Sequence, residues 1–451
     1  MPKVGLVSLG CPKALVDSEQ IATQLLDMGY EVELGDDSDV LVVNTCGFIE
    51  SAKEESREAI ADALEQGKKV VVTGCMGEAK GELANAFPQL EFISGPAEVA
   101  PVISAVKEYL PMATAPVLRD AGLPGEARAR LTSDHFAYLK ISEGCNHKCS
   151  FCIIPSMRGK LRSRELLNVI QEAEGLVADG AQELALIAQD LSAYGADLRY
   201  RQAHFAGQDY KTNLKSLCEI LGGIAPWVRL HYVYPYPHVD EIIPLMRDGV
   251  VLPYLDVPLQ HASPTVLKAM RRPAAAEKAL ERIHAWRDIC PELAIRSTFI
   301  VGFPGETDDD VGQLLDFLEA AELDRAGCFT YSAVDGAKAN LLEGHIDEAE
   351  KLDRQERVYE IQAEISARRL QRHVGQRLRV LVDEWEEGDP KQGDVHLVGR
   401  SMFDAPEIDG VVRLTVEGAP PGIGEFVWAD IIGSDHYDLY GHVVGEEIRI
   451  G

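Results

Sequence analysis

The chain has 451 residues, of which 46% are hydrophobic and 26% are charged. This composition is that of a globular protein with a sizeable core and excludes a disordered or fibrous chain, and such a length corresponds to about three domains. The 73 acidic and 44 basic residues give a net charge of −29. That charge argues against a phosphate backbone as the main partner, because nucleic-acid affinity depends on Lys and Arg neutralising phosphates. No apolar run approaches the roughly 18 residues of a membrane-spanning helix.

The first eleven residues, MPKVGLVSLGC, superficially imitate a bacterial lipoprotein signal, with a Lys, a short apolar stretch and a cysteine. The apolar stretch is shorter than the roughly 7 to 15 residues of a signal h-region, and an amphipathic segment follows it directly. We interpret the stretch as a buried strand and expect a cytoplasmic protein with no membrane partner.

Three cysteines follow three β-branched apolar runs, each of which precedes a helical pattern. Apolar runs that alternate with helices predict a parallel sheet covered on both faces. The carboxyl ends of the strands form the ligand-binding edge of such a sheet, so we expect the three cysteines to converge there. The runs are Val4–Leu9 before Cys11, Val40–Asn44 before Cys46 and Lys69–Thr73 before Cys75, and the helices include Asp17–Met28 and Ala52–Leu64.

Two interpretations of these three cysteines stay open. Free cysteine is most often a small buried hydrophobic residue, whereas three repeats of the same strand-end placement favour a set of ligands. Three thiolates leave a metal centre one ligand short. That number fits a four-iron, four-sulfur cluster with one free iron, or a zinc ion with an open position.

A second set, Cys145, Cys149 and Cys152, is compact and follows the strand-like run Phe136–Ile141. The C-x3-C-x2-C spacing allows one loop to wrap three corners of a cubane cluster. Structural zinc is the alternative, and it usually requires four protein ligands from paired C-x2-C or Cys/His elements. His147 lies inside the loop, but no second C-x2-C or H-x3-H motif follows it, which disfavours zinc.

The other three cysteines match neither pattern and are predicted to be structural. Cys218 lies in an apolar helical stretch, Cys290 precedes a proline, and Cys328 opens a strand. His238 and His261 have no partner ligand at metal-site spacing and are interpreted as hydrogen-bonding residues. The odd total of nine cysteines, spread over a long chain, argues against a disulfide framework.

The middle of the chain follows a stretch rich in Pro, Ala and Gly, Pro111–Gly125, that is typical of an interdomain linker. Six β/α units predict an open partial barrel, whose functional residues gather at the carboxyl ends of the strands. Gln189 would lie at that edge as a candidate cofactor contact, with a polar cap of the strand end as the alternative. The six apolar runs are Phe136–Ile141, Glu183–Gln189, Val228–Tyr234, Tyr254–Leu259, Leu293–Gly302 and Gly327–Ser332.

The last part of the chain follows a charged helical pattern, Asp347–Arg372, which we expect to be a solvated closing helix. From Gln376 onward, five short alternating strands separated by Gly, Pro and Asp predict a small antiparallel β-barrel. This part has 6 basic and 16 acidic residues, a net charge of −10. We expect it to attract a basic protein and repel tRNA phosphates, with Asp404, Glu407 and Asp409 on a candidate docking face.

The loop GCNHKCSFCIIP resembles the signature of the radical S-adenosylmethionine enzymes, in which three cysteines hold three irons and the fourth iron binds S-adenosylmethionine. Phe151 matches the aromatic residue that usually precedes the third cysteine and packs near the adenine. The three predicted parts resemble the methylthiotransferase family, which joins a three-cysteine α/β domain, a radical S-adenosylmethionine domain and a TRAM barrel. Segments that look like its RimO group are SLGCPKALVDSE, NTCGFIESAKEES, VTGCMGE, GCNHKCSFCIIPSMRGKLRSR, YLDVPLQH and RSTFIVGFPGETD.

The resemblance implies three domains, an N-terminal one at residues 1–118, a radical S-adenosylmethionine domain at 131–372 and a TRAM barrel at 376–451. It also implies two four-iron, four-sulfur clusters, one that generates the radical and an auxiliary one that delivers sulfur. The implied ligands are Cys145, Cys149 and Cys152 for the first cluster and Cys11, Cys46 and Cys75 for the second.

The reaction implied by the resemblance is methylthiolation of the β-carbon of an aspartate in the small-subunit ribosomal protein S12. S-adenosylmethionine would supply the methyl group and the radical, and an external electron donor would reduce the cluster. An unactivated C–H bond has no acid–base route at neutral pH, and we assign no catalytic acid or base. A tRNA methylthiotransferase is the alternative, favoured by the TRAM barrel and disfavoured by the acidic charge. An iron–sulfur electron carrier is a third hypothesis, although a carrier needs no barrel with an open cluster site.

Overall fold

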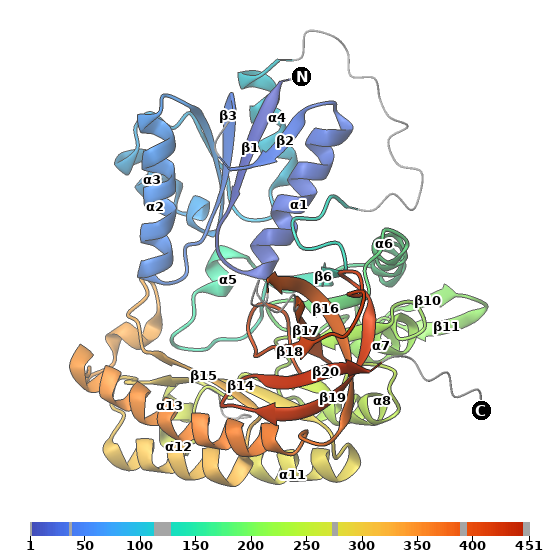
Figure 1. Ribbon diagram of the computed structural model, residues 1–451. Coiled ribbons are helices and arrows are strands. Elements are labelled where there is room, and N and C mark those ends of the chain that lie inside the picture. Colours follow the sequence, from blue (N-terminus) through green and yellow to red (C-terminus); the bar gives the residue numbers. More distant parts are fainter. Residues whose placement is uncertain (1, 36–37, 112–127, 273–277, 388–394, 445–451) are drawn as a thin grey trace.

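The computed structural model describes residues 2–35, 38–111, 128–272, 278–387 and 395–444 (Figure 1). Along the chain it contains a parallel sheet with flanking helices, a larger parallel sheet and a closed barrel. The predicted linker Pro111–Gly125 lies outside the described residues except for Pro111. The domain limits at residues 118, 131, 372 and 376 stay predictions.

The N-terminal sheet is parallel throughout. Its strands are β1 (Lys3–Ser8), β2 (Glu31–Leu34), β3 (Val40–Thr45), β4 (Lys69–Gly74) and β5 (Phe92–Ile93). Its helical segments are α1 (Pro12–Asp27), α2 (Glu50–Glu65), η1 (Cys75–Glu78), α3 (Lys80–Ala86) and α4 (Val99–Tyr109). Helices α1 and α4 cover one face and α2 and α3 the other. The apolar runs that predicted a doubly covered sheet are therefore confirmed as β1, β3 and β4.

The strand order of this sheet is β2-β1-β3-β4-β5. The chain leaves β1 toward β2 and then returns to β3 on the other side of β1, so the direction of winding reverses between β1 and β3. In open parallel sheets, ligands bind outside the carboxyl ends of the strands at such a reversal. Cys11 and Cys46 lie on the two loops that flank it.

The central sheet contains all six predicted strands. They are β6 (Phe136–Lys140), β9 (Glu183–Ile187), β12 (Trp227–Leu230), β13 (Tyr254–Asp256), β14 (Ala294–Val301) and β15 (Arg325–Thr330). They pair in parallel in the order β15-β14-β13-β12-β9-β6 and form an open sheet. The expected open partial barrel is confirmed, and its strands are buried because helices pack on the outer face.

Helices and hairpins connect the strands of the central sheet. The helical segments are α5 (Ile154–Met157), α6 (Leu166–Ala178), α7 (Leu214–Leu221), η2 (Pro237–Glu241), α8 (Ile243–Arg247), α9 (Pro264–Ala269), α11 (Ala279–Ile289), α12 (Asp308–Ala321) and η3 (Lys338–Leu341). The hairpins are β7 (Ser142–Glu143) with β8 (Arg162–Ser163), and β10 (Gln202–Phe205) with β11 (Gln208–Lys211). The β7–β8 hairpin encloses the compact cysteine loop.

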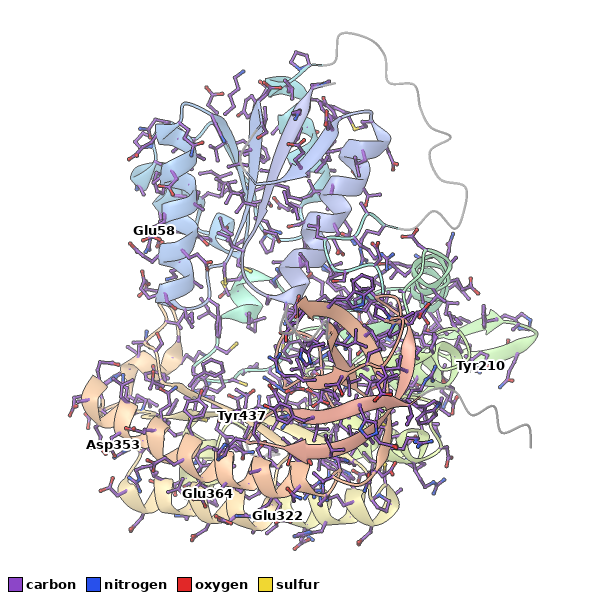
Figure 2. The ribbon with its side chains drawn as sticks, viewed as in Figure 1. Glu58, Tyr210, Glu322, Asp353, Glu364 and Tyr437 are labelled. Atoms are coloured by element: carbon purple, nitrogen blue, oxygen red, sulfur yellow. The ribbon has the colours of Figure 1, made fainter. Side chains whose placement is uncertain are left out.

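Helix α13 (Glu348–Gln371) has Asp347 as its N-cap residue, whose side chain accepts a hydrogen bond from the Glu350 N–H. Asp353 and Glu364 point away from the sheet, as expected for a solvated helix (Figure 2). Its other face is not solvated, because Val358 and Ile365 are fully buried against the central core. The many charged residues of this segment hid its apolar face in the sequence. In the structure α13 covers the edge strand β15.

The C-terminal part is a closed five-stranded barrel, as predicted. Its strands are β16 (Arg377–Glu387), β17 (Val395–Ser401), β18 (Val412–Thr415), β19 (Phe426–Ser434) and β20 (Leu439–Val444), in the order β16-β17-β18-β20-β19. Neighbouring strands pair antiparallel except β18 and β20, which pair in parallel and close the barrel. Closure leaves no unpaired sheet edge.

Two of the three carboxylates proposed for docking, Asp404 and Asp409, lie in an internal contact. Asp404 is 2% exposed and forms an ion pair with Arg325 of β15 at 2.7 Å. Asp409 accepts a hydrogen bond from Tyr254 at 2.7 Å, and Glu407 accepts one from Tyr138 at 2.9 Å. The expectation of a docking face was wrong for Asp404 and Asp409, whose side chains are buried where the loop after β17 attaches the barrel to the central sheet. Glu407 is exposed, and its part in docking stays a prediction.

Candidate functional site

The dispersed cysteines lie at three neighbouring strand ends of the N-terminal sheet. Cys11 is the N-cap residue of α1, Cys46 directly follows β3, and Cys75 begins η1 directly after β4. The three thiols are close enough to interact electrostatically. Gly10, with a φ of 99°, allows the first loop to approach the second, since a Cβ there would lie 3.2 Å from the Cys46 sulfur.

Two cations act on this dispersed triplet. Burial alone raises the pKa of the Cys11 thiol, but the charges of Lys13 and Arg158 outweigh burial and hold that pKa below its usual value. Burial raises the pKa of Cys46 and Cys75. The Arg158 Nε–H donates to the Cys75 sulfur at 3.3 Å. This contact joins the N-terminal sheet to a residue that follows the compact cysteine loop.

The compact triplet is held by its own loop. The backbone N–H of His147 donates to the Cys145 sulfur and that of Ile154 to the Cys152 sulfur, both at 3.4 Å. Arg272, which follows α9, donates to the Cys149 sulfur at 3.5 Å. Each sulfur therefore has a donor that stabilises its thiolate form.

Burial opposes ionisation of these thiols when they are free. It raises the pKa of Cys145 to about 11 and that of Cys152 to about 12. Metal binding must therefore displace protons from this loop.

The donor sets fit iron–sulfur clusters in their number and chemistry. Within the described residues, no three or more His, Cys, Asp or Glu side chains form a group that could hold one metal ion. A four-iron, four-sulfur cluster places each cysteine on a different iron. It therefore does not require the three sulfurs to converge on a single atom.

A buried set of four charges lies at the contact between the N-terminal and central parts. Lys140 and Arg158 are the cations, and each of them pairs with both Asp17 of α1 and Glu143 of β7. Burial raises the pKa of Glu143, but the two cations outweigh it and bring that pKa to about 2. Because Asp17 belongs to the N-terminal part and the other three to the central part, the four charges bind the two parts together.

Gln189 and Phe151, the predicted cofactor contacts, lie near this region. Gln189 follows β9 and donates its amide N–H to Glu143 at 2.7 Å. Its amide oxygen is buried and has no partner among the described residues. Phe151 packs on the apolar cluster that contains Leu267 and Phe303. Their contact with a cofactor stays a prediction.

Several residues that sequence reasoning passed over help to form the site. Lys13 lies two residues after Cys11, Arg158 six after Cys152, and both stand in segments that resemble the family. His147 already has other partners: its Nε2 is 2.9 Å from the Asp190 carboxylate, and its ring stacks on the Tyr234 ring with 4.0 Å between the centroids. A basic residue close to a patterned cysteine was the signal available for Lys13 and Arg158.

The three remaining cysteines are buried, and His238 and His261 form hydrogen bonds; their structural roles stay predictions. Cys218 and Cys328 are fully buried, and Cys290 is 3% exposed. His261 accepts the Ser263 N–H at 2.9 Å, and His238 lies 2.9 Å from the Ser192 carbonyl oxygen.

Family models match three segments of the chain in the expected order. Residues 3–95 match a family described as uncharacterized protein family UPF0004, residues 139–318 the Radical SAM superfamily and residues 374–444 the TRAM domain. Among solved structures, the radical S-adenosylmethionine methyltransferase TsrM from Kitasatospora setae aligns with a TM-score of 0.52 at 16% identity. The alignment covers 74% of this chain and 77% of that one, and it supports the fold alone. Fold and cysteine loop together define a radical S-adenosylmethionine enzyme.

Curated relatives cover nearly the whole chain. A protein of Acidithiobacillus ferrooxidans named ribosomal protein uS12 methylthiotransferase RimO is 56% identical over 98% of each chain. One of the same name from Alkalilimnicola ehrlichii is 55% identical over 98% of each chain. The chain belongs to the RimO family of methylthiotransferases. It is thus a radical S-adenosylmethionine methylthiotransferase, and its cofactors are S-adenosylmethionine and four-iron, four-sulfur clusters. Among the described residues, no helix is both long and apolar enough to cross a membrane.

Proposed function

We propose that this enzyme attaches a methylthio group to the β-carbon of an aspartate in ribosomal protein uS12. The observation that carries the proposal is the contact of Arg158, which follows the compact cysteine loop, with the Cys75 sulfur of the dispersed triplet. It supports the proposal because the reaction needs radical generation and sulfur supply in one molecule. The names of the relatives support uS12 as the substrate. A ribosomal protein as substrate implies a cytoplasmic enzyme.

In this proposal Cys145, Cys149 and Cys152 hold the radical-generating cluster, and the dispersed triplet holds the auxiliary cluster. When bound, the first cluster with S-adenosylmethionine supplies a 5′-deoxyadenosyl radical, and the second supplies sulfur. The number of donors supports the assignment, since each set has three thiols, which leaves one iron of a cubane without a protein ligand. An electron donor is required as a further partner.

The side chains of the protein position and shield the reactants. The Gln189 amide oxygen is available to accept a hydrogen bond from the cofactor, and Phe151 offers an apolar face to its adenine. On the inner face of the partial barrel, Val16 of α1 packs on Tyr138 and Ile187. Helix α1 thereby excludes water from one side of the space where a radical must be protected.

Anaerobic incubation of the cluster-loaded enzyme with S-adenosylmethionine, a reductant and either uS12 or tRNA tests the proposal. We expect one aspartate of uS12 to gain the mass of a methylthio group in place of one hydrogen, located by peptide fragmentation. Modification of tRNA with unmodified uS12 would overturn the substrate assignment. Cleavage of S-adenosylmethionine without any methylthio product on either substrate would also contradict it.

A further inference from the structure

Cys149 differs from the other two cysteines of the compact triplet in the origin of its hydrogen-bond donor. The Cys145 and Cys152 sulfurs accept hydrogen bonds from backbone N–H groups of their own loop. In the described part of the chain, the Cys149 sulfur accepts a hydrogen bond only from the Arg272 guanidinium, at 3.5 Å. Arg272 lies 123 residues further along the chain, so the middle sulfur of the loop depends on a distant side chain.

Several contacts fix the position of Arg272 against the loop. Its Nη2–H donates to the Pro258 carbonyl oxygen at 2.6 Å, and its guanidinium carbon lies 4.7 Å from the centroid of the Tyr234 ring. The loop is attached to the same end of α9, since the Ser150 N–H donates to the Met270 carbonyl oxygen at 3.0 Å. The guanidinium is therefore held beside the Cys149 sulfur before any iron is bound.

Arg272 is a buried charge. The residue is 5% exposed, and no Asp or Glu among the described residues forms an ion pair with it. A buried guanidinium group is costly unless an anion lies near it. Its contacts are a carbonyl oxygen, an aromatic ring and the Cys149 sulfur. Of these three, only the sulfur carries a full negative charge when it binds iron, because the thiolate is the form that binds a metal.

The charge of Arg272 also acts on the other two sulfurs of the triplet. Burial raises the pKa of Cys145 and Cys152, and the positive charge of Arg272 opposes burial at both thiols. Asp190 acts with the opposite sign at Cys145, but its carboxylate is itself 2.9 Å from the His147 ring nitrogen. One guanidinium group therefore stabilises negative charge on all three sulfurs.

We propose that Arg272 raises the reduction potential of the radical-generating cluster, by stabilising the negative charge that the compact triplet gains on reduction. The proposal rests on the proposed function, which assigns this cluster to Cys145, Cys149 and Cys152. Reduction adds one electron from the external donor and no proton, so the negative charge of the cluster with its three thiolates increases by one. Net charge and hydrogen bonds to the sulfurs are the factors that set such a potential.

The test uses the chain with Cys11, Cys46 and Cys75 replaced by Ala, so that only the compact cluster contributes to the spectrum. In this background, Arg272→Gln removes the charge and Arg272→Lys retains it. Titration with dithionite, followed by electron paramagnetic resonance, measures the midpoint potential. At a fixed potential, Arg272→Gln should lower the ratio of reduced to oxidised cluster on the order of tenfold, which for one electron is a shift of about 59 mV to more negative values. Arg272→Lys should keep most of the original potential.

Further readouts separate this role from a structural one. Iron content and the affinity for S-adenosylmethionine should be unchanged in Arg272→Gln, and a stronger one-electron reductant should restore its rate of 5′-deoxyadenosine formation. Arg379→Gln is the matched control, because the Arg379 guanidinium carbon lies 3.7 Å from the centroid of the Phe426 ring in the barrel, away from both triplets. The control should leave the potential unchanged.

An unchanged midpoint potential in Arg272→Gln overturns the proposal, and so does an equal shift in Arg272→Lys, which would exclude the charge as the cause. Loss of iron from both variants would give Arg272 a structural role in the loop instead. Weaker binding of S-adenosylmethionine at an unchanged potential would assign it to the carboxylate of the cofactor. If the background chain with Arg272 intact binds no iron, the proposed function itself fails, whereas bound iron with an unchanged potential in Arg272→Gln contradicts only the role of Arg272.

Discussion

The two cysteine triplets reach similar donor sets by opposite routes. Cys145, Cys149 and Cys152 lie within one loop, whose own backbone N–H groups contact two of the three sulfurs. The dispersed triplet exists only when three strands are aligned in one sheet, and Cys75 also takes a donor from Arg158 of another part of the chain. The compact site is therefore a local structure, whereas the dispersed site depends on the tertiary fold and on the contact between two parts of the molecule.

Removing one triplet at a time is expected to give the largest effects and to separate the two roles. Replacing Cys145, Cys149 and Cys152 with Ala should remove roughly half the iron and abolish 5′-deoxyadenosine formation, because the open-iron site is lost. Replacing Cys11, Cys46 and Cys75 should also remove about half the iron, abolish methylthiolation and leave cofactor cleavage measurable. Iron analysis and Mössbauer spectra of both variants measure this. Unchanged iron in the second variant would refute the auxiliary cluster.

Arg158→Met should affect the dispersed site more than the compact one. Its loss leaves Asp17 and Glu143 with one cation between them, and breaking a buried pair costs about 3–5 kcal/mol. We expect a lower free energy of unfolding and an altered auxiliary-cluster spectrum, with cofactor cleavage retained. Chemical denaturation and spectra recorded in the background lacking the compact triplet measure both effects. Arg57→Met, which removes an exposed cation of α2, is the control and should change neither.

Acid should weaken the contact between the N-terminal and central parts. The pKa of Glu143 falls from 4.5 to about 2 on folding, so its contribution to stability is complete above pH 4.5. That contribution, of the order of 3 kcal/mol, is lost as the pH falls from about 4.5 to about 2. Denaturation of the cluster-free chain between pH 6 and pH 3, compared with Glu143→Gln, measures it. An equal pH dependence in the variant would show that other carboxylates are responsible.

The smallest effects are expected at the cysteines outside both triplets. Cys218→Ala, Cys290→Ala and Cys328→Ala should each keep full iron content and activity. Each leaves a small cavity, and the loss of stability should be about 1–2 kcal/mol. Thermal unfolding and iron analysis suffice to check this. Loss of either cluster in one of the three would mean that a ligand had been mistaken for a core residue.

The sequence was informative where local pattern determines structure. The six central strands could be predicted because their apolar runs are buried on both faces, and the compact triplet because its spacing lies within one loop. Strand ends also predicted that Cys11, Cys46 and Cys75 share one sheet edge. The reversal of winding between β1 and β3 could not be read from those runs, since strand order depends on pairing.

Contacts between segments that are distant in the chain could not be predicted from the sequence. Arg158 and Cys75 are separated by 83 residues, and no local pattern links a guanidinium to a sulfur at that separation. Asp404 and Asp409 look like ordinary surface acids in the sequence, yet Arg325 and Tyr254 of the central sheet bury them. The sequence gives the total charge of the barrel, but it does not show which of the carboxylates face solvent.

The order of the parts along the chain has a consequence for biosynthesis. The N-terminal sheet and its helices end at Tyr109, so this part can fold before Arg158 has been translated. At about 5 to 20 residues per second, the 83 residues that follow Cys75 up to Arg158 take roughly 4 to 17 s to add. Until Arg158 has been added, the Cys75 sulfur lacks the guanidinium that donates to it in the folded chain. The dispersed triplet is therefore completed in two stages, the sheet edge first and its guanidinium donor several seconds later.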